Sequence, residues 1–66
     1  MNLSLLKQKR RELNISQQEM ANFFNYTRQN YGAKEVGKQN FKLSEIRELK
    51  KILNLTNDEI YEIFID

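Results

Sequence analysis

The clearest feature of the chain is the recurrence of apolar residues at the spacing of an α-helix. It is strongest near the C-terminal third, where the apolar positions are Leu43, Ile46, Leu49, Ile52 and Leu53. Residues three and four apart share one face of a helix, so this segment predicts a helix from about Leu43 to Leu53. Similar patterns predict four further helices: from about Ser4 to Leu13, from about Gln17 to Phe24, one that starts after Thr27 and reaches about Glu35, and one that starts after Thr56.

The predicted helices supply enough apolar side chains for one core. The residues expected to face it are Leu3, Leu6, Leu13, Met20, Ala21, Phe24, Tyr31, Leu43, Ile46, Leu49, Ile52, Leu53 and Ile60. The chain has only two glycines and no proline, which argues against the many tight turns of an all-β fold. We therefore predict a single all-α domain of five helices over residues 1–66.

A three-residue pattern, Asn followed by an apolar residue and then Ser or Thr, marks three of the predicted junctions: 14–16, 25–27 and 54–56. Asn tolerates the left-handed conformation that ends a helix, and Ser or Thr can cap the helix that follows. At the first and third junctions a Glu stands three residues after the Ser or Thr, the spacing of a capping box. The middle residues expected to turn inward are Ile15, Tyr26 and Leu55. The pattern is also an acceptor for N-linked sugars, but three copies between helices favour helix junctions.

The composition argues against several classes of protein. The chain has no Cys and no His, and so lacks disulfides, thiolate metal ligands and the usual acid–base group at neutral pH. No apolar run approaches the roughly 20 residues of a membrane span. The first residues also lack the apolar core of a signal peptide. We therefore expect a cytoplasmic protein that is not an enzyme and that binds no membrane, metal, cofactor or small-molecule ligand.

The net charge of +2 conceals an uneven distribution. Residues 1–42 contain eight Lys or Arg and three acidic residues, a balance of +5. Residues 43–66 contain three basic and six acidic residues, a balance of −3. A basic region next to an acidic one suggests one surface for a polyanion and another for a different partner. A solvated surface of mixed charge explains the same numbers, so charge alone does not decide between them.

The second and third predicted helices carry the pattern of a known DNA-binding motif. The segments SQQEMANF and TRQNYGAKE are joined by a short turn, as in a helix-turn-helix. The chain resembles the Cro and phage-repressor type of helix-turn-helix, also called XRE-like, in the segments ISQQEMA, NYTRQNY, KEVGKQN and LNLTNDEI. The register holds without a gap from Ile15 to Ile60. The resemblance implies a compact lambda-repressor-like domain whose helices 2 and 3 form the helix-turn-helix.

The resemblance implies that residues of about 27–35 form a recognition helix in the major groove of DNA. Arg28, Gln29 and Ala33 would read bases, since Arg pairs with guanine, Gln pairs with adenine, and Ala contacts the thymine methyl group. The residues implied to contact the DNA backbone are Gln17, Thr27, Asn30, Lys38, Gln39, Asn40, Lys42 and Arg10. Lys34 stands where the family has an apolar residue. We expect its stem to lie along the core with the ammonium in solvent.

These positions also have simpler interpretations. Arg28 and Gln29 are consistent with solvated residues of an exposed first turn, and Lys38 and Lys42 with solubilising charges. Asn30 suits a capping role as well as a DNA contact. The aromatic residues that could stack on single-stranded bases are Phe23, Phe24, Tyr31 and Phe41. Their spacing favours a place in the core or at its rim.

The resemblance further pairs Arg10 on the first helix with Glu35 at the end of the third. We expect this ion pair to hold the two helices together and to leave Arg10 near a phosphate. Removing one partner of a fully buried pair costs about 3–5 kcal/mol, because the other charge is left uncompensated. Stability measurements on single and double variants therefore test the pair.

Together with the resemblance, these residues predict a sequence-specific regulator of transcription that binds double-stranded DNA. One helix in one groove reads few base pairs, so a homodimer on a palindromic operator is expected. The acidic and apolar C-terminal segment EIYEIFID offers Tyr61, Phe64 and Ile65 as dimer contacts. The alternative is an antitoxin-like or anti-regulator module on the same fold, whose partner is another protein.

Overall fold

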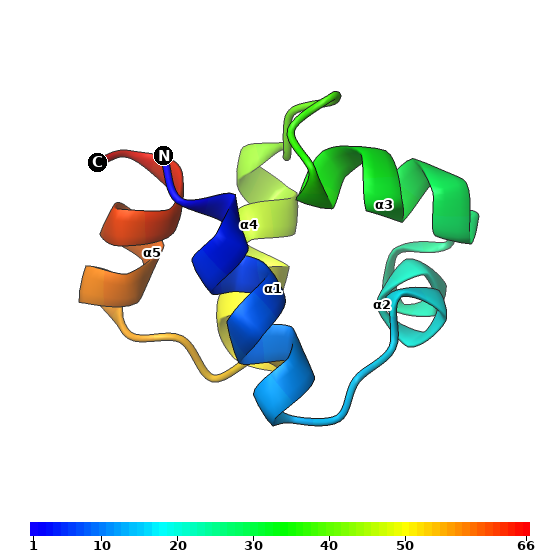
Figure 1. The fold of residues 1–66 in the computed structure, drawn as a ribbon, viewed down its shortest axis with the longest axis horizontal. Helices are drawn as coiled ribbons and strands as arrows, with labels where there is room; N and C mark the ends of the chain where they lie inside the picture. The colour runs from blue at the N-terminus through cyan, green and yellow to red at the C-terminus, as the bar shows by residue number, and fades with distance from the viewer.

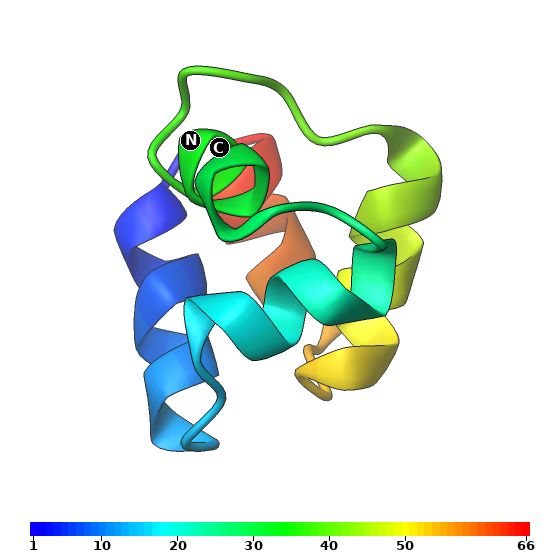
Figure 2. The same ribbon diagram turned by 90° about the vertical axis from the view of Figure 1, so that its right-hand side faces the viewer.

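The computed structural model describes all 66 residues and contains five α-helices and no strand. The helices are α1 (Leu3–Glu12), α2 (Gln17–Phe24), α3 (Arg28–Glu35), α4 (Leu43–Ile52) and α5 (Asn57–Phe64). Figure 1 shows α1 and α4 in the middle of the molecule, with α5 on one side and α2 and α3 on the other. Turned by 90°, α3 is seen nearly end on while α2 runs across the view beneath it (Figure 2). The prediction of an all-α domain with five helices is confirmed.

The first helix begins one residue earlier than its predicted start at Ser4. The side chain of Asn2 is the N-cap, and its Oδ1 accepts a hydrogen bond from the backbone N–H of Leu5 at 3.2 Å. The backbone N–H of Asn2 donates to the carbonyl of Ile63 at 2.8 Å, so the two ends of the chain lie side by side (Figure 1). None of the five helices has the length and apolar content needed to cross a membrane.

The three junctions have the same backbone geometry. Asn14, Asn25 and Asn54 all adopt the left-handed conformation, with φ of 57°, 57° and 52°. The backbone N–H of the residue after each Asn donates to the carbonyl five positions earlier: Ile15 to Arg10 at 3.2 Å, Tyr26 to Ala21 at 2.9 Å and Leu55 to Lys50 at 2.9 Å. The next residue in each case caps the following helix through its side-chain oxygen. The interpretation of the Asn-apolar-Ser/Thr pattern as a helix junction is therefore confirmed.

The core gathers side chains from all five helices and the third junction. Its buried apolar members are Leu6, Met20, Ala21, Tyr31, Leu49, Leu53, Leu55 and Ile63. Aromatic rings continue it from α2 towards α5, with centroids 6.4 Å apart for Phe24–Tyr31, 6.1 Å for Tyr31–Phe41 and 5.7 Å for Phe41–Phe64. These contacts place three of the four aromatic residues considered for base stacking in the core or at its edge. The prediction was wrong for Phe23, which is 60% exposed on α2.

Some apolar residues predicted to be buried lie at the surface. Leu13 is 49% exposed and Leu43 is 66% exposed. Leu13 is the C-cap of α1, and Leu43 is the first residue of α4. Ile63 is fully buried, whereas Ile60 is only half-buried. Leu13 and Leu43 were predicted to be buried because they continue the apolar pattern of their helices. Both stand at a helix end, where no neighbouring helix covers them.

Candidate nucleic-acid interface

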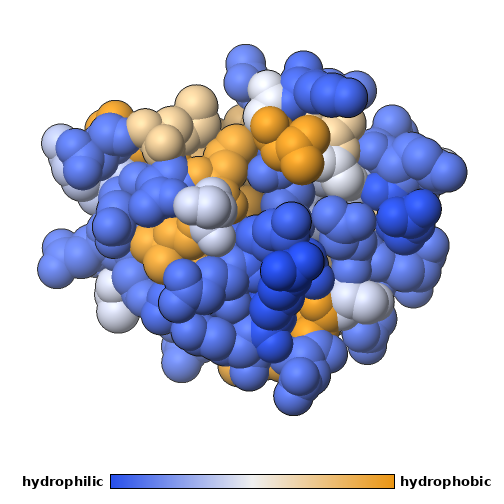
Figure 3. Space-filling model, in the orientation of Figure 1, coloured by the Kyte–Doolittle hydropathy of each residue, from blue (hydrophilic) through white to orange (hydrophobic).

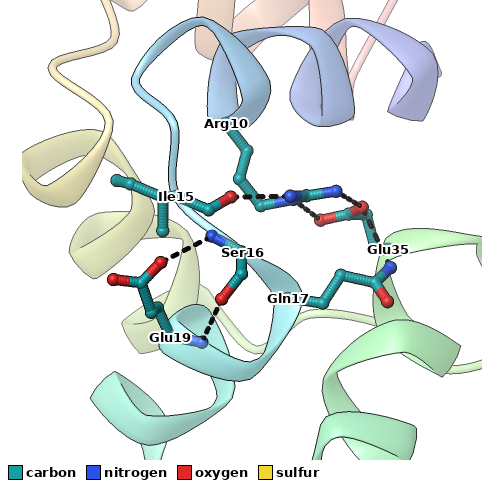
Figure 4. Close-up of polar contacts among 6 residues, drawn as sticks. All are labelled: Arg10, Ile15, Ser16, Gln17, Glu19 and Glu35. Atoms are coloured by element: carbon teal, nitrogen blue, oxygen red, sulfur yellow. Dashed lines mark hydrogen bonds and ion pairs between the residues drawn. The ribbon is translucent and has the colours of Figure 1, made fainter.

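The N-terminus of α2 is closed by a complete capping box (Figure 4). The hydroxyl of Ser16 accepts from the backbone N–H of Glu19 at 3.0 Å, and the Glu19 carboxylate accepts from the N–H of Ser16 at 2.9 Å. Those two hydrogen bonds hold the pKa of Glu19 below its ordinary value. The first N–H groups of the helix, at Gln17 and Gln18, have no partner within the helix, and such groups favour an anion.

A buried ion pair between Arg10 and Glu35 joins α1 to α3 (Figure 4). The Arg10 guanidinium contacts both carboxylate oxygens, Nε to Oε2 at 2.9 Å and Nη2 to Oε1 at 3.0 Å. Its remaining nitrogen, Nη1, donates to the carbonyl of Ile15 at 2.7 Å, and Gln17 Nε2 donates to Glu35 Oε1 at 3.3 Å. Arg10 is 5% exposed and Glu35 3%. The pair therefore ties together α1, the first junction, α2 and the last turn of α3.

The surroundings of Glu35 keep it ionised. Burial on its own raises the pKa of this carboxyl, but the hydrogen bonds from Arg10, with a further contribution from Gln17, outweigh burial and lower the pKa below the ordinary value of 4.5. Burial, together with the Glu35 carboxylate, also raises the pKa of the Tyr31 hydroxyl. At neutral pH the end of α3 thus holds a full negative charge that is matched by Arg10.

A shallow polar depression of about 450 Å³ lies where α1, the first junction, α2 and α3 meet. It is lined by Lys7, Arg10, Arg11, Ser16, Gln17, Gln18 and Arg28, with no apolar residue among them. Four of the lining residues are cationic and none is acidic, and only Arg10 has a buried counter-charge. Together with the free N–H groups of α2, this distribution gives the depression a positive potential that suits an anion.

Lys7 and Arg11 were not among the residues predicted from the sequence to form a site. They are four residues apart on α1 and so share the face on which the depression opens. That spacing is visible in the sequence. Which face of α1 meets the start of α2 depends on how the helices pack, and the two residues alone do not indicate it.

The first turn of α3 presents polar side chains to solvent. The Thr27 hydroxyl accepts from the backbone N–H of Asn30 at 3.1 Å, so Asn30 serves the cap through its main chain. The side chains of Arg28, Gln29 and Asn30 are exposed. Ala33, one turn after Gln29, is half-buried. Arg28 also lines the depression, which makes the exposed turn and the depression one continuous polar surface.

The segment between α3 and α4 carries the remaining predicted contact residues. Lys38, Gln39, Asn40 and Lys42 are all exposed in this loop, which arches over the end of α3 in Figure 2. The backbone N–H groups of Lys38 and Gln39 both donate to the carbonyl of Ala33, at 2.8 and 3.2 Å. The start of the loop is thereby fixed to α3.

Lys34 departs from the expectation that its ammonium would lie in solvent. The residue is only 8% exposed, and Nζ donates to the carbonyl of Asn40 at 3.1 Å and to Glu45 Oε1 at 3.2 Å. The expectation was wrong because Glu45, on α4, supplies a buried counter-charge. A lysine with such a partner has no need to extend into water.

Of the residues predicted to form a dimer contact, Tyr61 and Phe64 lie on α5 and Ile65 is its C-cap. Figure 1 shows α5 on the opposite side of α1 and α4 from α2 and α3. Tyr61 is 55% exposed and Ile65 is 67% exposed. Phe64 is half-buried and its ring packs edge-on against Phe41, so it already belongs to the core of this chain. Of the three candidates, Tyr61 and Ile65 are the two that remain available to a partner.

Two parts of the surface thus differ in chemistry. In Figure 3 the part over α2 and α3 is mostly hydrophilic, whereas apolar side chains reach the surface mainly nearer the chain ends. The polar part combines the depression, the exposed turn of α3 and the basic loop. Comparison of the chain with protein-family models, curated proteins and solved structures gives no significant match, and the geometry above is therefore the basis on which function is proposed.

Proposed function

We propose that the protein is a sequence-specific regulator of transcription, similar to Cro and phage repressors, that binds double-stranded DNA. In this proposal α2 and α3 act as a helix-turn-helix and α3 enters the major groove with its N-terminus first. One observation carries it: the first turn of α3 is exposed and polar beside a cationic depression, while its last turn is buried and ion-paired. A helix held at its back and free at its front is suited to groove recognition.

The exposed turn supplies the base contacts in this proposal. Arg28 pairs with guanine through O6 and N7, and Gln29 pairs with adenine through N6 and N7. Ala33 is half-buried, so it touches a thymine methyl group only if α3 lies deep in the groove. We therefore assign the main share of sequence preference to Arg28 and Gln29.

The DNA backbone is contacted on either side of α3. The depression receives a phosphate between the N–H groups of α2 and the cations Lys7 and Arg11, with Gln17 as a further donor. Lys38 and Lys42 in the loop meet phosphates beyond the other end of the helix. Each neutralised phosphate contributes about −0.9 to the slope of log K against log salt. The three contacts, one in the depression and one each at Lys38 and Lys42, give a slope of roughly −3 per protomer.

A second copy of the chain completes the proposed complex. One helix reads only a few base pairs, so two copies on a palindrome supply the specificity that a regulator needs. Tyr61 on α5 and Ile65 at its C-cap are exposed and provide apolar contacts between copies. Sedimentation analysis tests this point: a protein that remains monomeric at high micromolar concentration, with and without its operator, contradicts the dimer.

Selection of binding sites from a random duplex pool is the direct test of the proposal. We expect a short palindrome, with affinity that falls steeply as salt is raised from 50 to 200 mM. The same selection with Arg28→Ala should recover a site in which one base pair of each half-site is no longer specified. Recovery of no consensus, together with an affinity insensitive to salt, contradicts DNA binding.

The alternative function is a protein-binding module of the antitoxin or anti-regulator kind. The exposed Tyr61 and Ile65, next to the acidic residues of α5, favour it, because an apolar pair with an acidic rim resembles a protein contact. Salt separates the two functions. Protein binding through α5 should change little between 50 and 200 mM salt and should be lost in Tyr61→Ala rather than in Arg28→Ala.

A further inference from the structure

Lys34 and Glu45 form a second buried ion pair, which joins the last turn of α3 to the first turn of α4. Nζ of Lys34 lies 3.2 Å from Oε1 of Glu45, and the residues are 8% and 5% exposed. Neither has a place in the DNA contacts proposed above. Two buried charges are costly unless their hydrogen-bonding groups are satisfied, so their partners show what the pair does.

The partners of the pair include the main chain of the loop on both sides of Phe41. On one side, the Lys34 ammonium donates to the carbonyl of Asn40 at 3.1 Å. On the other, the Glu45 carboxylate accepts from the backbone N–H of Lys42 at 2.6 Å. The pair therefore holds the loop backbone at two points, separated by a single residue.

Aromatic side chains enclose the pair. The ammonium of Lys34 lies 5.3 Å from the ring centroid of Tyr26 and 6.0 Å from that of Phe41. The Tyr26 hydroxyl also donates to Glu45 Oε2. Burial alone raises the pKa of Glu45, but its three donors, Tyr26, Lys42 and Lys34, outweigh burial and keep the carboxyl ionised. The ionic contacts are thus shielded from water and from salt.

We infer that the Lys34–Glu45 pair, with Tyr26, positions the loop of residues 36–42 so that Lys42 faces the DNA backbone in fixed register with α3. Lys34 and Glu45 are positioning residues that touch no DNA. An apolar residue at position 34 would fill the same space but would leave the Asn40 carbonyl without its donor. The inference rests on the proposed function for its DNA part, while its structural part concerns the loop alone.

The loop part is tested by the backbone dynamics of Lys34→Met measured with ¹⁵N relaxation. We expect order parameters for residues 40 and 41 to fall from about 0.85 to below about 0.6, with those of residues 28–31 unchanged, because Lys34 contacts the Asn40 carbonyl and the Phe41 ring. Lys51→Met is the matched control, since it removes the same charge from a side chain on α4 that is 78% exposed. Unchanged order in the loop of a folded Lys34→Met protein overturns the inference.

The DNA part is tested by the salt dependence of duplex binding by the same variants. Lys34→Met should weaken binding to cognate and unrelated duplexes alike and reduce the salt slope by up to about 1 per protomer, because the contact of Lys42, beside the loosened residues 40 and 41, loses its order while Lys38 stays bonded to α3. Lys51→Met should match the parent. If the loop of Lys34→Met loses order but the variant keeps the parent's DNA affinity and salt slope, the positioning role is overturned.

Lys34→Met leaves the Glu45 carboxylate buried without its counter-charge and could therefore unfold. A second variant avoids this problem. Lys34→Met/Glu45→Gln removes both charges and keeps both side-chain volumes, which is tolerated far better than a lone buried charge. It should show the same loop mobility. A parent protein that binds no duplex overturns the proposed function, and the relaxation measurement still decides whether the pair orders the loop.

Discussion

The first and last turns of α3 contain similar residues in opposite environments. In the first turn Arg28, Gln29 and Asn30 are exposed. In the last turn Lys34 and Glu35 are 8% and 3% exposed, and each is ion-paired with a different helix. The difference arises from the available partners: Glu45 and Arg10 face the end of α3, whereas no acidic residue lines the depression beside its start.

The comparison shows why charge type alone does not identify a binding residue. Arg28 and Lys34 are both basic residues of one short helix, yet only Arg28 is available to an external anion. Lys34 and Glu35 point to different neighbours although they are adjacent, because successive residues of a helix are about 100° apart around its axis. The buried end fixes the helix so that the exposed end has a defined direction. The variants below test that division, beginning with the largest effect expected.

Arg10→Met should have the largest effect on stability. It leaves the Glu35 carboxylate buried without its counter-charge, which should lower the free energy of unfolding by about 3–5 kcal/mol in urea titration. Arg11→Met is the matched control, because Arg11 is exposed and its loss should change stability by no more than about 0.5 kcal/mol. The double variant Arg10→Met/Glu35→Leu should recover much of the loss. A double variant as unstable as either single variant contradicts the ion pair as the cause.

Acid should lower the free energy of unfolding by protonating Glu35, with a smaller effect than Arg10→Met. The pKa of Glu35 in the folded protein lies below the ordinary 4.5, so its stabilisation is fully present above that pH and is lost as pH falls through the lower, folded-state value. The free energy of unfolding should therefore decrease as pH drops below about 4.5. Glu35→Gln should be less stable than the parent at pH 7 and show a flatter acid slope. Some slope should remain, since Glu19, Glu45 and Glu59 also have lowered pKa values.

Arg28→Ala should affect binding without affecting folding. Loss of a bidentate contact to guanine should cost about 1–3 kcal/mol on the cognate duplex and relax the preference at that base pair. The free energy of unfolding should stay within about 0.5 kcal/mol of the parent, because the side chain is exposed. Arg47→Ala removes the same charge from an exposed position of α4 and serves as the control. If Arg28→Ala binds every duplex with the same affinity as the parent, Arg28 does not read a base.

Gly32→Ala is expected to have the smallest effect, at the boundary between the two ends of α3. An added Cβ would lie 3.8 Å from the side-chain nitrogen and oxygen of Gln17, an ordinary contact. The exchange should raise the free energy of unfolding by about 0.5–1 kcal/mol, since Gly is a poor helix former. DNA affinity should stay within about twofold, because the methyl group faces α2. A large loss of affinity would show that position 32 itself approaches the DNA.

The features that sequence predicted well are local ones. The left-handed Asn residues and the capping boxes depend on a few neighbouring residues, and so the junctions were recognisable from spacing. The five helices followed from periodicity for the same reason. Helix ends were predicted less accurately. The apolar pattern of the first helix continues to Leu13, although α1 ends at Glu12 and Leu13 is half exposed.

The features that sequence did not reveal depend on how the helices meet. The burial of the Lys34 ammonium required Glu45, eleven positions further along and on another helix. The depression required Lys7 and Arg11 of α1 to face the start of α2. Spacing within one helix gives the face that each residue shares, but it does not give the neighbour that the face meets. Such contacts need the packed structure.

The hydrogen bond from Asn2 to the carbonyl of Ile63 has a practical consequence. The chain starts and finishes at one corner of the molecule, on the side of α5 and away from the first turn of α3 (Figure 1). In a dimer that pairs through Tyr61 and Ile65, a flexible peptide can therefore connect the end of one copy to the start of the other. Such a covalent tandem raises the effective concentration of the second copy to the millimolar range. Comparing the DNA affinities of the tandem and of a single copy on the same duplex would separate the affinity for one half-site from the gain due to pairing.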